Sequence, residues 1–435
     1  MALVTPTAST TAANETGTLS NRLAFSFVTV LFFMFGFITV LNDILVPHLK
    51  ALFELNYAQA ALVQFTFFGA FFLVSIPAGY VVNKIGYQKG TVYGLVLTAI
   101  GCSLFYPAAQ IQSYGLFLFG LFVLASGVTQ IQVAVNPYVS VLGPSETASV
   151  RLNLSQAFNS LGTTIAPILG TAFILAGAVK NSAELQLMSA TELADYRDMQ
   201  ADAVKFPYLG LTIALLVLAF IVSKVKLPKI PTETDSSSNS TLFEKIFGTV
   251  LQHRPLVLGA IAIFCYVGAE VAIGSYLINF FGLPEILNYK ETSAGSLVAL
   301  YWGGAMVGRF AGAAVLSKIK PEKVLMANAI IAGILVIAAM VLTGWAAAIS
   351  ILAVGLFNSI MFPTIFTIAI EGLGERTPQA SGVLCMAIVG GAIIPVMQGA
   401  LADQIQLHHS FILPVLCYGF IAYYALDRLR PRANT

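Results

Sequence analysis

The chain has 435 residues, of which 57% are hydrophobic and only 10% are charged. A soluble domain usually carries about 25% charged residues, so the composition excludes a soluble protein. The net charge of +2 gives no reason to expect a nucleic-acid partner. The four cysteines lie in apolar segments without metal-ligand spacing, which indicates small packing residues. We therefore expect an integral protein of the lipid bilayer.

Twelve apolar segments follow a polar start that is rich in Thr and Ser. Each is long enough to cross a bilayer, which takes about 20 residues of helix. The sequence therefore predicts an all-α membrane protein with twelve transmembrane helices. In chain order we expect them near 23–46, 58–82, 90–108, 114–140, 153–178, 206–224, 255–281, 294–316, 323–343, 347–370, 379–400 and 409–427.

A polar stretch in the middle of the chain divides these helices into two groups of six. It contains Pro, Ser and charges of both signs, a composition typical of linkers. The predicted parts are a disordered cytoplasmic N-terminal tail (1–21), two six-helix bundles (22–224 and 255–427), a cytoplasmic linker between them (225–254) and a cytoplasmic C-terminal tail (428–435).

The Lys and Arg residues predict the orientation. If both termini are cytoplasmic, that side carries 16 of the 22 Lys and Arg residues and the other side carries 5, as the positive-inside rule requires. The remaining one, Arg309, is expected to contact another helix or to reach toward the surface rather than to bind a ligand. A run of acidic residues is expected to form an external loop: Glu184, Glu192, Asp195, Asp198 and Asp202.

Two carboxylates lie inside predicted helices that occupy matching places in the two halves. They are Asp43 in the first helix and Glu270 in the seventh. A charge at bilayer depth costs at least about 2.5–3.5 kcal/mol, so an intramembrane acid suggests a functional site. The pair predicts a transporter whose substrate or coupling ion binds near the midplane.

Prolines also recur at matching places. In the fourth and tenth helices, Gln132 and Asn358 each lie five residues before a proline, Pro137 and Pro363. The fifth and eleventh helices carry a second matched pair, Pro167 and Pro395. A proline inside a spanning helix frees a carbonyl and kinks the helix. Matched kinks are expected when two similar bundles bend around a shared cavity.

Buried amides gather on three of the predicted helices. Gln156, Asn159 and Thr163 share one face of the fifth helix, Gln132 and Asn136 share one face of the fourth, and Asn42 adjoins the acid of the first. Amides both donate and accept hydrogen bonds, which suits a hydrophilic, uncharged substrate. The alternative is that they bond helix to helix. Aromatic side chains are candidates for stacking on a sugar ring: Phe65, Phe68, Tyr266, Tyr301 and Trp302.

An enzyme is not expected, and neither is a cofactor other than a coupling ion. The sequence has no Gly-rich phosphate loop followed by GK[ST], so ATP is not the predicted energy source. The four histidines lie at the ends of predicted helices or in loops, where solvated surface positions are expected.

Several motifs resemble one family. They are LNDILVPHL (41–49), NPYVSVLGP (136–144), RLNLSQAFNSLG (151–162), FCYVGAEVAIGSYLI (264–278) and FNSIMFPTIFTIAIEGLG (357–374). These motifs are similar to those of the fucose permease family of the major facilitator superfamily. QVAVNPYVS and YVGAEVAIGS look most like its bacterial glucose/galactose transporter branch. The resemblance implies two six-helix bundles and sugar uptake driven by a cation gradient.

The resemblance also assigns roles to individual residues. The family's proton-linked aspartate of helix 1 matches Asp43, and its sugar-contacting Gln and Asn of helix 5 match Gln156 and Asn159. Its sugar-binding glutamate of helix 4 falls where this chain has Gln132. Glu270 stands where the fucose permeases have an uncharged residue, so one acid is lost and another gained.

We expect a symporter that takes up a glucose- or galactose-like hexose, driven by a sodium or proton gradient. The substrate-binding residues would be Gln132, Asn136, Gln156, Asn159, Glu270, Tyr266, Trp302 and Asn358. The coupling residues would be Asp43, Asn42, Gln132 and Glu270, with Asp43 and Gln132 as a sodium site.

Two alternatives remain at this point: a proton-coupled symporter of fucose or another monosaccharide, and a drug/proton antiporter of the same fold. In each case the chain would be a monomer in a bacterial inner membrane, with both termini cytoplasmic.

Overall fold

The computed structural model describes residues 24–38, 40, 57–173, 187–225, 227–228, 230 and 252–430, and all regular elements within these residues are helical. The first half contains a first helix (Ala24–Ile38), α2 (Tyr57–Ile85), α3 (Tyr87–Gln110), α4 (Tyr114–Val141), the short 3₁₀ turn η1 (Ser145–Thr147), α5 (Ala148–Phe173) and α7 (Ala190–Lys224). The second half contains α9 (Arg254–Gly282), α10 (Glu291–Leu316), α11 (Pro321–Val341), α12 (Gly344–Asn358), α13 (Met361–Ile370), η2 (Gly374–Arg376), α14 (Thr377–Met386), η3 (Ala387–Val389), α15 (Gly390–Ile405), α16 (Leu407–Ser410) and α17 (Ile412–Leu429).

Each of the twelve predicted spans contains a helix among the described residues. Ten stretches in that part of the chain are long and apolar enough to cross a membrane. The predicted tenth and eleventh spans are interrupted, as α12 and α13 and as α14, η3 and α15. The break between α12 and α13 follows from Pro363, which has no N–H to bond the carbonyl of Ser359.

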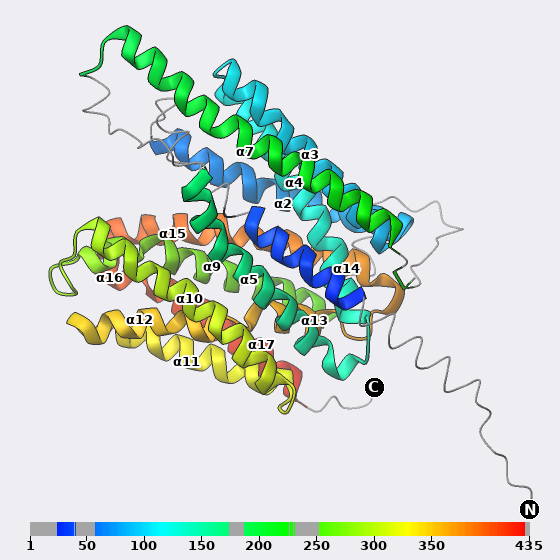
Figure 1. Ribbon diagram of the computed structural model, residues 1–435. Helices are drawn as coiled ribbons and strands as arrows, with labels where there is room; N and C mark the ends of the chain where they lie inside the picture. The colour runs from blue at the N-terminus through cyan, green and yellow to red at the C-terminus, as the bar shows by residue number, and fades with distance from the viewer. Residues whose placement is uncertain are drawn as a thin grey trace, which may run out of the picture.

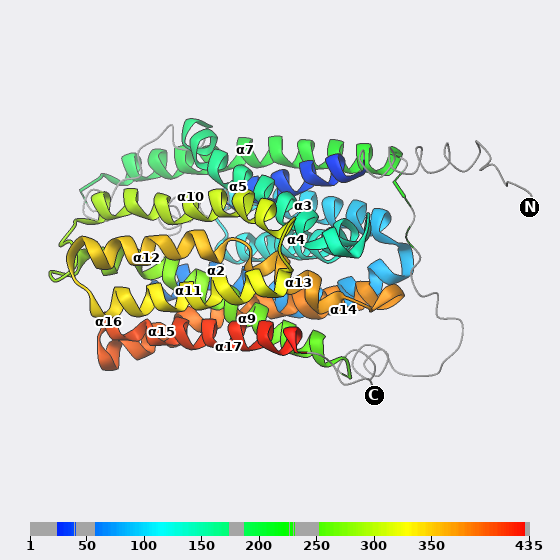
Figure 2. The same cartoon turned by 90° about the horizontal axis from the view of Figure 1, so that it is seen from below.

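Figure 1 shows two groups of helices: α2, α3, α4 and α7 of the first half, and α9 to α17 of the second half, against which α5 of the first half also lies. In the first, α3 packs against α4 and α7, and α4 also packs against α2. In the second, α11 packs against α12 and α17, and α9 packs against α15 and α17. The helices α5 and α10 lie side by side where the halves meet, in both views (Figures 1 and 2).

The helices cross the fold in alternating directions, which defines two ends. We call the end at which α7 ends and α9 begins the linker end, and the opposite one the far end. The helices α2, α4, α10, α13 and α17 run toward the linker end, while α3, α5, α11 and α14 begin there.

One expectation about the first half is wrong. The acidic stretch expected as an external loop is the beginning of α7, from Ala190 onward, apart from Glu184, which lies outside the described residues. Ser189 caps this helix: its hydroxyl accepts from the N–H of Glu192 at 3.3 Å, and the Glu192 carboxylate accepts from the N–H of Ser189 at 2.8 Å. This reciprocal capping box satisfies two N–H groups at the start of the helix, which explains why a polar segment continues the transmembrane helix.

Candidate functional site

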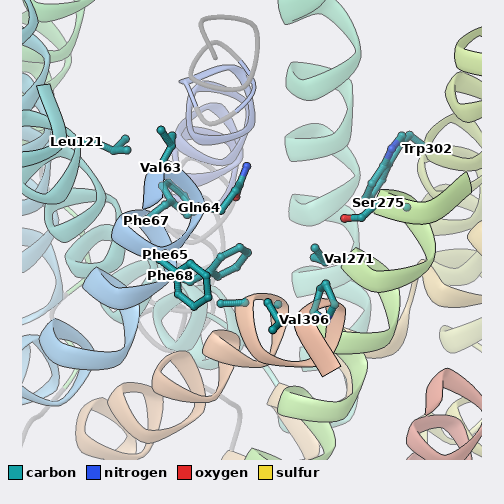
Figure 3. A pocket seen from close by; sticks show the side chains of 14 residues that line it. Val63, Gln64, Phe65, Phe67, Phe68, Leu121, Val271, Ser275, Trp302 and Val396 are labelled. Carbon is teal, nitrogen blue, oxygen red and sulfur yellow. The ribbon is translucent and has the colours of Figure 1, made fainter. Parts of the chain in front are cut away.

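A cavity of about 480 Å³ lies between the two halves, on the far-end side (Figure 3). The first half contributes α2 and α4 to its wall, and the second half contributes α9, α10 and α15. Its lining is largely apolar and aromatic: Val63, Gln64, Phe65, Phe67, Phe68, Leu121, Val271, Gly274, Ser275, Trp302, Gly391, Ala392, Pro395 and Val396. Phe65, Phe68 and Trp302 were predicted to stack on a sugar ring, and all three face this space. Gln64 and Ser275 approach it from opposite halves and were not predicted.

On the linker side of this cavity the halves are held together by hydrogen bonds between buried polar side chains. The hydroxyls of Ser149 on α5 and Thr367 on α13 are 2.6 Å apart. The amide of Asn153 donates to the hydroxyl of Thr364 at 3.3 Å. We call these four residues the linker-end seam. Polar side chains in contact across a membrane-embedded interface bind helices together because lipid offers no competing partners.

A third bond across the halves uses a carbonyl that a proline has freed. Pro137 leaves the carbonyl of Val133 without its helical N–H partner, and the hydroxyl of Ser381 on α14 donates to it at 2.9 Å. Beside this bond, α2 and α14 approach closely: a Cβ added to Gly79 would lie 2.8 Å from the carbonyl oxygen of Pro378. The halves are therefore in direct contact at the linker end.

These contacts follow the internal repeat. Asn153 lies fourteen residues before Pro167, and Ser381 lies fourteen residues before Pro395. Asn153 reaches from the fifth span to the tenth, and Ser381 reaches from the eleventh span to the fourth. The two prolines therefore mark equivalent positions, and the equivalent polar residues each reach the equivalent helix of the other half, although they bond different groups on it.

Glu270 lies on α9, partly buried, one turn before the cavity-lining Gly274. The hydroxyl of Tyr266, one turn earlier, donates to its carboxylate at 2.7 Å. A hydrogen bond donated to a carboxylate stabilises the charge, and its geometry holds the group in one orientation. Two residues predicted at the site, Glu270 and Tyr266, are thus directly bonded, and Glu270 shares the α9 face that lines the cavity.

The amide of Asn358 is bonded within the second half. It donates to the hydroxyl of Tyr301 on α10 at 2.9 Å and accepts from the hydroxyl of Tyr418 on α17 at 2.7 Å. The Tyr301 hydroxyl in turn donates to the backbone carbonyl of Glu270 at 3.3 Å. Asn358, Tyr301 and Tyr418 are fully or almost fully buried. In this state the Asn358 amide links α12 to α10 and α17, and the Tyr301 hydroxyl connects α10 to the backbone of Glu270 on α9.

Three of the predicted amides of the first half lie beside the first helix: Gln132, Asn136 and Asn159. The amide of Asn159 donates to the carbonyl of Phe32 at 3.1 Å. Gln132 and Asn136 border a small gap beside Leu31, Phe32 and Phe35 of that helix. Gln156 is buried, and its backbone carbonyl accepts from the hydroxyl of Ser160 at 3.2 Å. Asn159, like Asn358, is thus occupied by helix–helix bonding in this state.

The predicted site is therefore only partly brought together. Of the predicted substrate-binding residues, Trp302 lines the cavity within the described part of the chain. Glu270 lies one turn and Tyr266 two turns before the cavity-lining Gly274. Asp43 and Asn42 lie outside the described residues, so the predicted sodium site of Asp43 with Gln132 stays a prediction. Tyr418 was missed, because one tyrosine in an apolar span carries no signal in a single sequence.

Two helical bundles around a cavity, with an acid inside a spanning helix, define a secondary transporter. The family model of the Major Facilitator Superfamily matches residues 26–396. The chain belongs to this superfamily and, within it, to the family that contains the L-fucose–proton symporters.

Relatives and solved structures agree with this membership. The chain is 53% identical to the glucose/galactose transporter of Brucella abortus, over 95% of this chain and 96% of that one. It is 35% identical to the L-fucose–proton symporter of Escherichia coli, over 95% and 94% of the two chains. A crystal structure of the transporter FucP in the outward conformation matches with a TM-score of 0.88 and 34% identity, covering 95% of this chain and all of that one. The predicted family and all-α fold are confirmed.

Proposed function

We propose that this protein is a symporter that takes up glucose or galactose, driven by a sodium or proton gradient. The proposal is carried by Glu270, an acid inside a spanning helix on the face that lines the cavity between the halves. It is supported by the 53% identity to a chain described as a glucose/galactose transporter. Aromatic side chains at the cavity wall suit the apolar face of a pyranose ring.

Alternating access gives the contacts described above a role. The sugar enters the cavity from the far end while the linker-end seam holds the halves together. Rocking of one bundle against the other then breaks the bonds of Ser149, Asn153 and Ser381 and opens the linker end. The first-half amides, which border the first helix in this state, contact the sugar as the bundles move.

The coupling ion would bind at Asp43, at Glu270 or at both. A proton requires a carboxylate whose protonation is favoured by burial. A sodium ion requires the carboxylate together with amide or backbone oxygens, from Gln132, Asn42 and Asn136 at Asp43, or from the backbone near Gly268 and Gly274 at Glu270. Neither ion is favoured by the contacts of Glu270, since the Tyr266 hydroxyl is compatible with both.

The count of Lys and Arg supports a linker end and two termini that face the cytoplasm. With that orientation the cavity faces outward, which agrees with the match to an outward conformation of FucP. We propose a monomer in a bacterial inner membrane. A proton-coupled fucose symporter is the second candidate, favoured by the 35% identity over nearly the whole chain. The apolar, aromatic cavity wall keeps the drug/proton antiporter as a third.

The test is the uptake of radiolabelled glucose, galactose and fucose into vesicles that contain the purified protein, with sodium and proton gradients imposed in turn. We expect accumulation of glucose or galactose above the external concentration with one of the two gradients. The Glu270→Gln variant should need a much higher concentration of the coupling ion or the sugar for half-maximal uptake. Accumulation of fucose alone would favour the second candidate, and accumulation of no sugar with either gradient would contradict the proposal.

A further inference from the structure

Arg309 is a permanently charged side chain inside a spanning segment, Ser293–Leu316. A charge in this position is costly unless it is paired and fully hydrogen-bonded. It lies on α10, one of the helices of the second half that pack against α5 of the first (Figures 1 and 2). The expectation that it contacts other helices is borne out by its bonds.

The first bond of Arg309 is within its own half and is a consequence of a proline. Pro363 leaves the carbonyl of Ser359 without a helical partner, and the Nε–H of Arg309 donates to that carbonyl at 3.3 Å. The approach is close because Gly308 packs against this break: a Cβ added there would lie 2.8 Å from the Cβ of Ser359. The guanidinium is thus anchored at the break between α12 and α13.

The second bond crosses to the other half. An Nη–H of Arg309 donates to the hydroxyl of Ser160 on α5. That hydroxyl donates in turn to the backbone carbonyl of Gln156, one turn earlier on α5, at 3.2 Å. Arg309 therefore links the proline break of the second half to the α5 segment that carries Gln156 and Asn159.

Arg309 carries the charge opposite to that of the Glu270 carboxylate. It lies on α10, which packs against α9, the helix of Glu270. The two helices are joined nearby, since Tyr301, two turns before Arg309 on α10, donates to the backbone carbonyl of Glu270. In a medium of low dielectric constant this attraction is weakly screened.

We propose that Arg309 is a positioning residue that couples the charge of Glu270 to the contact between the two halves. While Glu270 is anionic, its attraction keeps the guanidinium oriented, so that Ser160 and α5 are held against α10. When a bound cation or a proton neutralises Glu270, that attraction is lost, the bond to Ser160 weakens and the halves separate more readily at the linker end. The inference rests on the proposed function only in treating Glu270 as the acid that becomes neutralised.

The test measures the separation of the halves without sugar or transport. Spin labels on Glu146→Cys and Glu322→Cys, which border a space of about 310 Å³ between the halves at the linker end, report the ratio of open to closed populations by pulsed electron resonance. The chain without added cysteines serves as the labelling blank, because three of its four cysteines are buried and the fourth is half-buried.

Ser160→Ala should raise the ratio of open to closed populations about fivefold, since it removes a hydrogen bond to a charged group. Ser126→Ala is the matched control: Ser126 is equally buried in the first half and donates to the carbonyl four residues earlier, that of Phe122, as Ser160 does to Gln156. This control should leave the ratio within about twofold of wild type, as expected for a hydrogen bond inside one helix.

The decisive measurement is a double-mutant cycle between Ser160 and Glu270, residues with no direct bond to each other. Glu270→Gln alone should raise the ratio severalfold, and Ser160→Ala should then change it less than about twofold, because residues of one network are not additive. Arg309→Gln should abolish the coupling. Arg309→Lys keeps the positive charge but loses the guanidinium, whose separate N–H groups bond two oxygens at once. Its closed population should therefore lie between those of Arg309→Gln and wild type.

Additive effects of Ser160→Ala and Glu270→Gln would overturn the proposal and leave Arg309 as a structural link between the halves. An unchanged ratio in Ser160→Ala would also overturn it. Failure of glucose and galactose uptake together with a non-additive cycle would refute the proposed substrate while supporting the coupling through Arg309.

Discussion

At the scale of single residues, the hydroxyl of Tyr266 sets the environment of Glu270. Tyr266→Phe removes the donor to the carboxylate at nearly constant volume, and the lost hydrogen bond to a charged group is worth about 1.5–3 kcal/mol. We therefore expect the half-saturating concentration of the coupling ion or of the sugar to change about tenfold or more, as measured from uptake curves.

The control for this variant is Tyr424→Phe. Tyr424 is also fully buried, but its hydroxyl has no hydrogen-bond partner among the described residues. Removal of that hydroxyl should leave the uptake curves and the melting temperature close to those of wild type. Equal effects of the two substitutions would show that the bond between Tyr266 and Glu270 has no functional role.

Gln156 and Asn159 were predicted to act alike, and the structure separates them. Each alanine substitution should weaken sugar binding by about 1–3 kcal/mol, because it strips a partner from a desolvated hydroxyl. Asn159→Ala should also lower the melting temperature, since it removes the bond between α5 and the carbonyl of Phe32 on the first helix, whereas Gln156→Ala should not. Calorimetric binding and thermal unfolding of the purified variants measure both effects. Binding within twofold of wild type for both would remove this face of α5 from the sugar site.

At the scale of helices, the break between α12 and α13 depends on Pro363. Pro363→Ala restores an N–H that can bond the carbonyl of Ser359, in competition with Arg309. We expect a continuous helix, an unchanged or higher melting temperature and a severalfold lower maximal rate of uptake. Pro107→Ala, at the far end of α3, is the control and should leave the rate unchanged. A normal rate in Pro363→Ala would show that the break is not needed for transport.

The sequence predicted the helices and their kinks, but not which side chains bond the carbonyls that the prolines leave free. Long apolar runs and prolines are local features, so the spans and the matched pairs of prolines could be read directly. Ser381 and Arg309 lie far along the chain from the carbonyls they bond, and only the packing of the halves brings them together. The start of α7 could have been predicted from the sequence, since Ser189 and Glu192 form an S-x-x-E capping box. The roles of the amides could not be predicted, because one sequence cannot separate amides that contact sugar from amides that bond another helix, as Asn159 does.

At the scale of the whole molecule, the linker-end seam should act as a gate. The hydroxyls of Ser149 and Thr367 are 2.6 Å apart, so cysteines at the two positions would be close enough to form a disulfide, provided that their backbones allow its geometry. Oxidation of the double variant should abolish uptake, a reductant should restore it, and sugar binding from the far end should persist throughout. Each single cysteine is the control. Continued uptake by the fully cross-linked protein would show that the halves need not separate here.

The bond from Ser381 to the carbonyl of Val133 has a consequence for the solvent. Pro137 prevents that carbonyl from being bonded by its own helix, so it loses its partner whenever the halves part. The hydroxyl of Ser149 likewise loses its bond to the hydroxyl of Thr367, whereas Thr367 and the amide of Asn153 keep bonds to carbonyls of their own helices. A bare polar group at membrane depth costs several kcal/mol, and water is the replacement at hand. Opening of the linker end is therefore also a hydration reaction, whose equilibrium depends on the activity of water in the compartment it opens to. Solutes too large to enter the opening would draw water out of it and favour the closed form.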